Sequence, residues 1–94
     1  VEINEPIHFI GIGGTGMRPL AELCRAEGIK FSGSDIKESK FIKSLKKDAQ
    51  IFVGHRRENI NDCKTLVVSS AIDMQNPEII EAIERNIPIA HVDL

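Results

Sequence analysis

The sequence of 94 residues contains no tryptophan, no tyrosine and only two cysteines, Cys24 and Cys63. Because these thiols share no short metal-type spacing, they exclude a disulfide-rich scaffold and a cysteine-based metal centre. We interpret both as reduced and structural, and we expect Cys24 to face the core. No apolar run approaches the roughly 18 residues of a membrane span, and the acidic, proline-containing start is unlike a signal peptide. We therefore expect no membrane contact and a cytoplasmic location.

An excess of charge of one sign is also missing. Twelve basic residues oppose fourteen acidic ones, which gives a formal net charge of −2 and a pI near 5.9. This balance provides no strong attraction to nucleic acid. The length allows one domain, residues 1–94, with a modest core. Because the chain begins at Val1 rather than Met and ends just after an apolar run, we expect it to be excised from a longer protein.

Four glycines near the start stand out against this background. The apolar run of residues 7–10 stops at Gly11, and an apolar helical period follows, which indicates a strand, a tight turn and a helix. Gly11, Gly13 and Gly16 have the G-x-G-x-x-G spacing that lets a backbone turn tightly and approach a phosphate. We expect the helix to open near Thr15, so that its unpaired N–H groups and positive dipole end face an anionic diphosphate.

Strand and helix signals alternate along the rest of the chain. We expect the first helix to end at a left-handed Gly28, a second to be capped by Ser39, and a third to run from Asn76-Pro77-Glu78 to a left-handed Asn86. The further strands are expected at residues 30–34, 50–53, 65–68 and 87–90, with a loose helical turn around residues 58–60.

This alternation predicts an α/β fold, a Rossmann-like open parallel sheet of about five strands with flanking helices in three layers. The ligand crevice of such a sheet lies outside the carboxyl ends of the strands. Four segments follow expected strands and should line it, namely the glycine loop, Ser34-Asp35, Gly54-His55 and Ser69-Ser70-Ala71.

The polar candidates have ordinary alternatives. Asp35 either binds a ribose or has a capping or turn role before the second helix. His55 either hydrogen-bonds to a base or ribose or is an ordinary surface residue. Ser69 and Ser70 are ligand contacts or turn formers, because no histidine and acid accompany them in a nucleophile motif. We interpret as structural or solvated His8, His91, Lys40, Lys43, Lys46 and Lys47.

Sequence motifs typical of catalysis, ATP binding and metal binding are missing. The sequence contains no G-x-x-x-x-G-K-[ST] loop for ATP, no metal-ligand spacing and no set of nucleophile, base and acid. We therefore expect the chain to bind a ligand without catalysing a reaction, with no catalytic residue, no metal and no cofactor of its own.

Five motifs in order resemble the amino-terminal domain of the Mur ligases. They are HFIGIGGTGM at residues 8–17, SGSD at 32–35, IFVGH at 51–55, VVSSAI at 67–72 and NPE at 76–78. The resemblance covers nearly the whole chain. The Gly-Gly-x-Gly-Met and Ser-Ser-Ala-Ile forms favour the UDP-N-acetylmuramate:L-alanine ligases over the related murein-peptide ligases.

The resemblance implies an enzyme of bacterial peptidoglycan synthesis, and so of cell wall biogenesis, cell shape and cell division, that couples ATP hydrolysis to amide-bond formation. In that family the amino-terminal domain holds the UDP-sugar, a central domain carries the P-loop and metal, and a carboxy-terminal domain helps to close the site. This chain would be the first of the three. Its ligand would be UDP-N-acetylmuramate, and ATP and magnesium would belong to the parent protein.

Site residues follow from the resemblance position by position. The diphosphate would lie against Gly13, Gly14, Thr15, Gly16 and Met17, and the uridine would lie among Ser34, Asp35, His55, Ser69, Ser70 and Ala71. Gly11 and Arg18 are also assigned to the UDP-sugar site. Two departures stand out. Arg18-Pro19 follows the methionine where the family has serine, which removes a hydroxyl and adds a cation that can pair with phosphate. The family usually has glycine near Asp48, and aspartate tolerates the left-handed conformation less well than glycine but can adopt it.

Two other functions remain open. The same glycines and Asp35 also fit a nicotinamide-dinucleotide-binding domain of a dehydrogenase, although the Ser-Ser-Ala loop argues against it. A regulatory or interaction module that keeps the fold without a ligand finds its best support in Arg18-Pro19.

Overall fold

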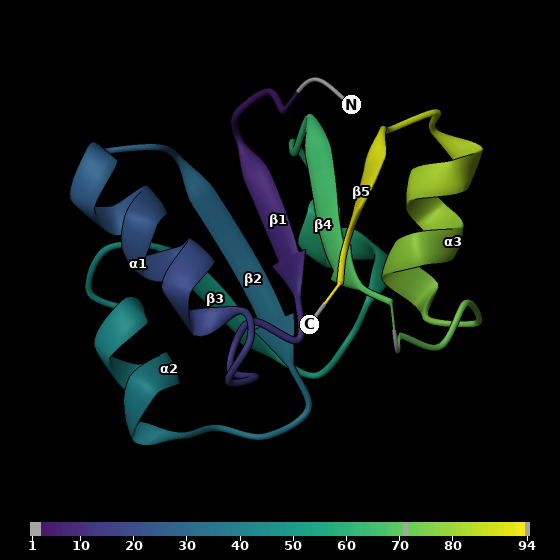
Figure 1. Cartoon of the computed structure of the whole chain (residues 1–94). Coiled ribbons are helices and arrows are strands. Elements are labelled where there is room, and N and C mark those ends of the chain that lie inside the picture. The colour runs from purple at the N-terminus through teal and green to yellow at the C-terminus, as the bar shows by residue number, and fades with distance from the viewer. Residues whose placement is uncertain (1–2, 71, 94) are drawn as a thin grey trace.

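The computed structural model describes residues 3–70 and 72–93. The described part contains β1 (Ile7–Ile10), α1 (Arg18–Glu27), β2 (Phe31–Asp35), α2 (Lys40–Leu45), β3 (Gln50–Val53), the 3-10 helix η1 (Arg57–Ile60), β4 (Thr65–Ser69), α3 (Pro77–Glu84) and β5 (Ile89–Val92) (Figure 1). The strands pair in parallel in the order β3-β2-β1-β4-β5. The predicted Rossmann-like sheet is confirmed.

Helices cover both faces of this sheet and make three layers. Figure 1 shows α1 and α2 on one side and α3 on the other. Successive strand residues point to opposite faces, and β1 follows this rule. Ile7 and Phe9 pack with buried residues of α1 and α2, whereas Ile10 packs with Ile79 of α3. One apolar core therefore lies on each side of the sheet.

The two cysteines lie in different cores. Cys24 packs on the α1 side and Cys63 on the α3 side, and both are buried, free thiols. Burial raises the pKa of Cys24, and it raises that of Cys63 to about 11. The expected reduced, structural state of both residues fits this placement, and Cys24 faces the core as expected.

Most predicted helix ends are confirmed. Gly28 ends α1 with a φ of 69°, and Asn86 follows α3 with a φ of 57°. The Ser39 hydroxyl accepts a hydrogen bond from the N–H of Ile42, and the Asn76 side chain accepts one from the N–H of Glu78. These caps stabilise the starts of α2 and α3 because the first N–H groups of a helix have no partner within it.

The start of α1 was predicted wrongly. The helix begins at Arg18 rather than near Thr15. Two tight turns come first, because the N–H of Gly14 donates to the carbonyl of Gly11 and the N–H of Met17 donates to that of Gly14. Pro19 is then the second residue of the helix, where its missing N–H costs no intrahelical bond.

Three smaller expectations also need correction. β2 and β4 each extend one residue further than expected, to Asp35 and Ser69. β5 begins at residue 89 rather than 87, because the N–H of Ile87 donates to the carbonyl of Ala82 and completes the end of α3. Asp48 does not use the left-handed conformation that was open to it, since Asn86 is the one non-glycine residue with positive φ in the described chain. Asp48 instead lies 3.2 Å from Nε of Arg25.

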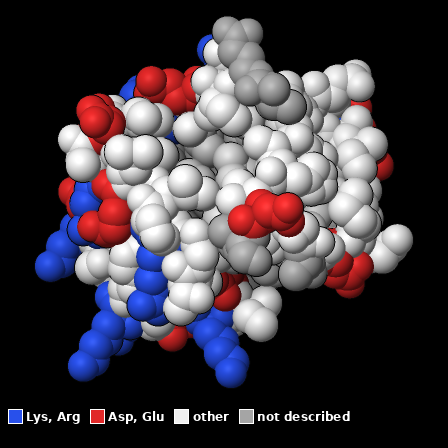
Figure 2. Space-filling model, in the orientation of Figure 1, with Lys and Arg blue, Asp and Glu red and all other residues white. Residues whose placement is uncertain are grey.

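Basic side chains gather over α2, in the lower left of Figure 2. Lys40, Lys43, Lys46 and Lys47 are all exposed, as expected of a solvated face. No helix in the part of the chain described is long and apolar enough to cross a membrane.

Candidate functional site

The predicted site segments meet at one edge of the sheet. The glycine loop follows β1, Asp35 ends β2, His55 comes two residues after β3, and Ser69 ends β4. Because all strands are parallel, these carboxyl ends lie together, at the lower end of the strands in Figure 1. We call this the carboxyl edge.

The glycine loop, residues 11–17, is fastened to β2. Gly11 adopts a φ of 75°, which glycine tolerates best, and the N–H groups of Gly11 and Ile12 both donate to the carbonyl of Ser34. Ile12 is fully buried over Gly33, where an added Cβ would lie 2.6 Å from Cδ1 of Ile12. The loop can lie this close to β2 because residue 33 has no side chain.

Asp35 braces the same loop. Its Oδ2 accepts a hydrogen bond of 2.8 Å from the N–H of Gly13, and its Oδ1 accepts one of 2.7 Å from the N–H of Ile36. A Cβ on Gly13 would lie 2.9 Å from Oδ2 of Asp35 and 3.0 Å from Cδ1 of Ile42. Of the two roles left open for Asp35, the turn role is visible in this geometry.

Two backbone donors in the loop lack an acceptor. The N–H groups of Gly14, Met17 and Arg18 all donate to loop carbonyls. Those of Thr15 and Gly16 have no acceptor among residues 3–70 and 72–93. Thr15 is exposed, so an anion from solvent can reach this pair of N–H groups. The donors thus belong to the loop that precedes α1, not to the first turn of the helix as expected.

Met17 and Arg18 differ sharply in exposure. The Met17 side chain is 1% exposed and belongs to the core, so only its backbone could reach a ligand. Arg18 is exposed, and its Nε donates to the carbonyl of Gly13. The guanidinium carbon lies 5.1 Å from the ring centroid of Phe41, a distance typical of cation–π contact. The structure therefore holds one cation beside the loop.

Glu78 lies at the centre of a buried polar network that the sequence did not reveal. The side chain is fully buried in the first turn of α3. Its Oε1 accepts hydrogen bonds of 2.7 Å from Nε2 of His8 and from the hydroxyl of Ser34. Its Oε2 accepts bonds from the Asn59 amide at 2.8 Å and the N–H of Arg56 at 3.2 Å. One carboxylate thus joins β1, β2, η1 and α3 beneath the carboxyl edge.

Two uridine-site candidates take part in this network. Ser34 is fully buried, and its hydroxyl donates to Oε1 of Glu78. Its place beside a bound uridine stays a prediction. His55 is partly buried, with Nδ1 2.9 Å from Oγ of Ser34 and 3.3 Å from Oε2 of Glu78. His55 is therefore not the ordinary surface residue that one interpretation proposed. His8, also buried, has the structural role expected of it.

The serines after β4 lie at the same edge. Ser69 is partly buried and Ser70 is exposed, and the N–H of Ser70 donates to the carbonyl of Val92. Ala71 lies outside the described residues. For both serines, the two roles predicted from the sequence, ligand contact and turn former, remain open.

The charge on Glu78 makes stability depend on pH. Burial acts to raise the pKa of this carboxyl, but hydrogen bonds from His8, Ser34 and Asn59 outweigh burial and hold the pKa below its usual value. A lowered folded-state pKa stabilises the fold above the unfolded value of about 4.3, and this stability is lost as pH falls through the folded value. As the pH falls below about 4.3, we expect the free energy of unfolding to decrease less in Glu78→Gln than in the unaltered chain. Urea unfolding at several pH values measures this, and parallel pH profiles would contradict it.

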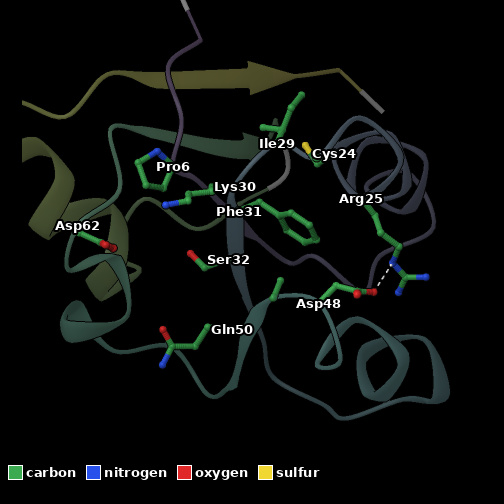
Figure 3. A pocket seen from close by; sticks show the side chains of 12 residues that line it. Pro6, Cys24, Arg25, Ile29, Lys30, Phe31, Ser32, Asp48, Gln50 and Asp62 are labelled. Carbon is green, nitrogen blue, oxygen red and sulfur yellow. Dashed lines mark ion pairs between the residues drawn. The ribbon is translucent and has the colours of Figure 1, made fainter.

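A cavity lies at the opposite edge of the sheet. About 490 Å³ in volume, it opens at the amino ends of β2 and β3, where Figure 3 shows Arg25, Lys30, Asp48 and Gln50 among its lining side chains. Its polar groups include the Arg25–Asp48 ion pair at 3.2 Å. No group of three potential metal ligands occurs in the described ranges. The carboxyl edge therefore remains the candidate site, because two of its N–H groups have no acceptor in the part of the chain that the structure describes.

Comparison with known proteins points to one family. Residues 6–93 match the family model described as Mur ligase family, catalytic domain. The chain is 54% identical over 83 residues to the UDP-N-acetylmuramate–L-alanine ligase of Aquifex aeolicus, covering 87% of this chain and 18% of that protein. It is 49% identical over 87 residues to the same enzyme of Clostridium botulinum, covering 92% and 19%. The chain thus spans less than a fifth of these curated relatives.

A solved structure agrees with these relatives. The crystal structure of UDP-N-acetylmuramate-alanine ligase MurC from Thermotoga maritima superposes with a TM-score of 0.84 at 36% sequence identity. The match covers 90% of this chain and 20% of the Thermotoga chain. The likeness therefore concerns one part of a longer enzyme.

Proposed function

Since this chain belongs to the Mur ligase family, we propose that it is the substrate-binding domain of an enzyme that joins L-alanine to UDP-N-acetylmuramate in the cytoplasm. The relatives named above carry that activity in their names, and the chain covers one part of each. ATP and magnesium would be bound by the central domain of the parent protein. A carboxy-terminal domain would complete the site.

One observation carries the proposal, the pair of N–H groups of Thr15 and Gly16 that have no acceptor among the described residues. Two adjacent backbone donors at the carboxyl edge suit the oxygens of a diphosphate. Arg18 adds a positive charge beside them, anchored to the carbonyl of Gly13. The uridine would then extend toward His55 and the serines that follow β4.

The dehydrogenase alternative has less support. It requires Asp35 to accept hydrogen bonds from a ribose, whereas the relatives and the solved structure named above are all UDP-N-acetylmuramate–L-alanine ligases. The proposed role also implies that the chain alone turns over no substrate, because its sequence has no P-loop. Turnover of ATP, L-alanine and the UDP-sugar by this chain would contradict that part of the proposal.

Calorimetric titration distinguishes the two functions. We expect UDP-N-acetylmuramate to bind, UDP to bind more weakly and NAD to show no binding. Gly13→Asp should weaken binding of the UDP-sugar at least tenfold, or about 1.4 kcal/mol, because its carboxylate would crowd Asp35 and repel a diphosphate.

Lys46→Ala is the control for this titration. Lys46 follows directly after α2, is exposed and pairs with Glu38, so its loss should leave affinity unchanged. Tighter binding of NAD than of the UDP-sugar would overturn the proposed function in favour of a dehydrogenase domain.

A further inference from the structure

The two ring nitrogens of His55 have different surroundings. Nδ1 faces inward, 2.9 Å from the hydroxyl oxygen of Ser34. Nε2 has no hydrogen-bond partner within the described part of the chain, and the side chain is 16% exposed. The ring therefore offers one nitrogen to the protein and the other to the carboxyl edge.

The proton on His55 follows from the hydrogen bonds of Ser34. An ionised carboxylate only accepts hydrogen bonds, so the Ser34 hydroxyl must donate its single proton to Oε1 of Glu78 at 2.7 Å. Toward His55 the same hydroxyl can then only accept, which requires a proton on Nδ1. In a neutral imidazole with Nδ1 protonated, Nε2 carries the lone pair.

The Glu78 carboxylate is held firmly enough to fix the direction of the hydrogen bonds that Ser34 makes. The Asn76 side chain accepts a hydrogen bond from the N–H of Glu78 and fixes the first turn of α3. The carboxylate also accepts bonds from His8 and Asn59, and both donors are buried. Rotation of the carboxylate away from Ser34 would leave these buried donors without this acceptor, which is unfavourable.

We propose that Glu78 is a positioning residue that, through Ser34, keeps the proton of His55 on Nδ1 and so presents Nε2 as a hydrogen-bond acceptor to the bound nucleotide. This inference rests on the proposed function, because it assumes that a uridine nucleotide lies at the carboxyl edge. The ligand must then supply a donor. The N3–H of uracil and a ribose hydroxyl share this chemistry, whereas cytosine presents an acceptor at N3.

The chain contains a matched control for this arrangement. Ser32 lies on the same strand as Ser34, and its hydroxyl oxygen lies 2.7 Å from Nδ1 of His8. Ser32→Ala and Ser34→Ala therefore each delete one hydroxyl that contacts the Nδ1 of a histidine. Only Ser34→Ala changes the contact with His55.

The test is nitrogen-15 NMR of the His55 ring in the unliganded chain at neutral pH. We expect Nδ1 to be protonated in the unaltered chain and in Ser32→Ala. In Glu78→Gln, the amide can donate to Ser34, whose hydroxyl can then donate to Nδ1, so the form protonated on Nε2 should appear. Ser34→Ala leaves Oε2 of Glu78 3.3 Å from Nδ1, so it should populate that form less than Glu78→Gln does. A proton on Nε2 in the unaltered chain, or unchanged tautomers in both variants, would overturn the inference.

Affinities identify the donor on the ligand. We expect Glu78→Gln to weaken UDP binding about tenfold, with Ser32→Ala unchanged. If uracil N3–H is the donor, the unaltered chain prefers UDP to CDP and the variant loses that preference. If a ribose hydroxyl is the donor, the unaltered chain prefers UDP to 2′-deoxy-UDP and Glu78→Gln loses that preference. Retention of both preferences in Glu78→Gln contradicts the inference. A chain that binds no UDP refutes the proposed function, while the ring spectrum still decides the tautomer.

Discussion

Replacing Glu78 with alanine is expected to lower the free energy of unfolding by about 3–5 kcal/mol, the cost typical of removing one partner from a buried charge network. The variant leaves the Nε2–H of His8, the Ser34 hydroxyl and the Asn59 amide without their shared acceptor. A domain has only about 5–15 kcal/mol of stability, so much of it would be lost. Urea unfolding at neutral pH measures the difference.

Glu84→Ala is the matched control for this prediction. Glu84 belongs to the same helix but is exposed, so its removal should change stability by no more than about 0.5 kcal/mol. Equal effects of the two substitutions would show that the buried network contributes nothing beyond helix propensity.

Gly33→Ala is expected to destabilise the chain by about 2–3 kcal/mol, as overpacking of a tight core does. The new Cβ would lie 2.6 Å from Cδ1 of Ile12 and 2.9 Å from its Cβ and Cγ2, distances at which atoms must move. Because Ile12 belongs to the glycine loop, the loop itself would be pushed from β2. Thermal unfolding measures the stability, and weaker binding of the UDP-sugar should accompany its loss.

A double substitution separates this clash from a general effect on the strand. Ile12→Val removes Cδ1, the atom that lies nearest to the added methyl group. Gly33→Ala combined with Ile12→Val should therefore lose less stability than the sum of the two single variants. Strict additivity would mean that Ile12 is not what the methyl group meets.

Local signals explain what the sequence predicted well. Left-handed residues at Gly28 and Asn86, and caps at Ser39 and Asn76, depend on a few neighbouring residues and were confirmed. The alternation of strands and helices, together with the right-handed crossover rule, was enough to predict the parallel sheet. The start of α1 was wrong because successive turns in the glycine loop take the backbone bonds that a longer helix would need.

Glu78 shows what local signals could not reveal. Its place after Asn76-Pro77 is typical of a first-turn acid at a solvated helix start, and that interpretation needs no burial. Its role depends on β1, β2 and η1 all reaching the same point, which is a property of the fold. His8 was the available hint, since a polar residue in the apolar run of residues 7–10 requires a buried partner. The same network explains why the hydroxyl of Ser34 is buried.

The most direct test of the account is a nitrogen-15 amide spectrum of the chain titrated with UDP-N-acetylmuramate. The account predicts that the amides of Thr15 and Gly16 show the largest shifts, with smaller changes at Asp35 and His55. The reason is that the diphosphate accepts the two N–H groups for which the described residues offer no acceptor. Shifts confined to the cavity at the opposite edge, around Lys30 and Gln50, would contradict it. So would a spectrum that does not change at saturating ligand.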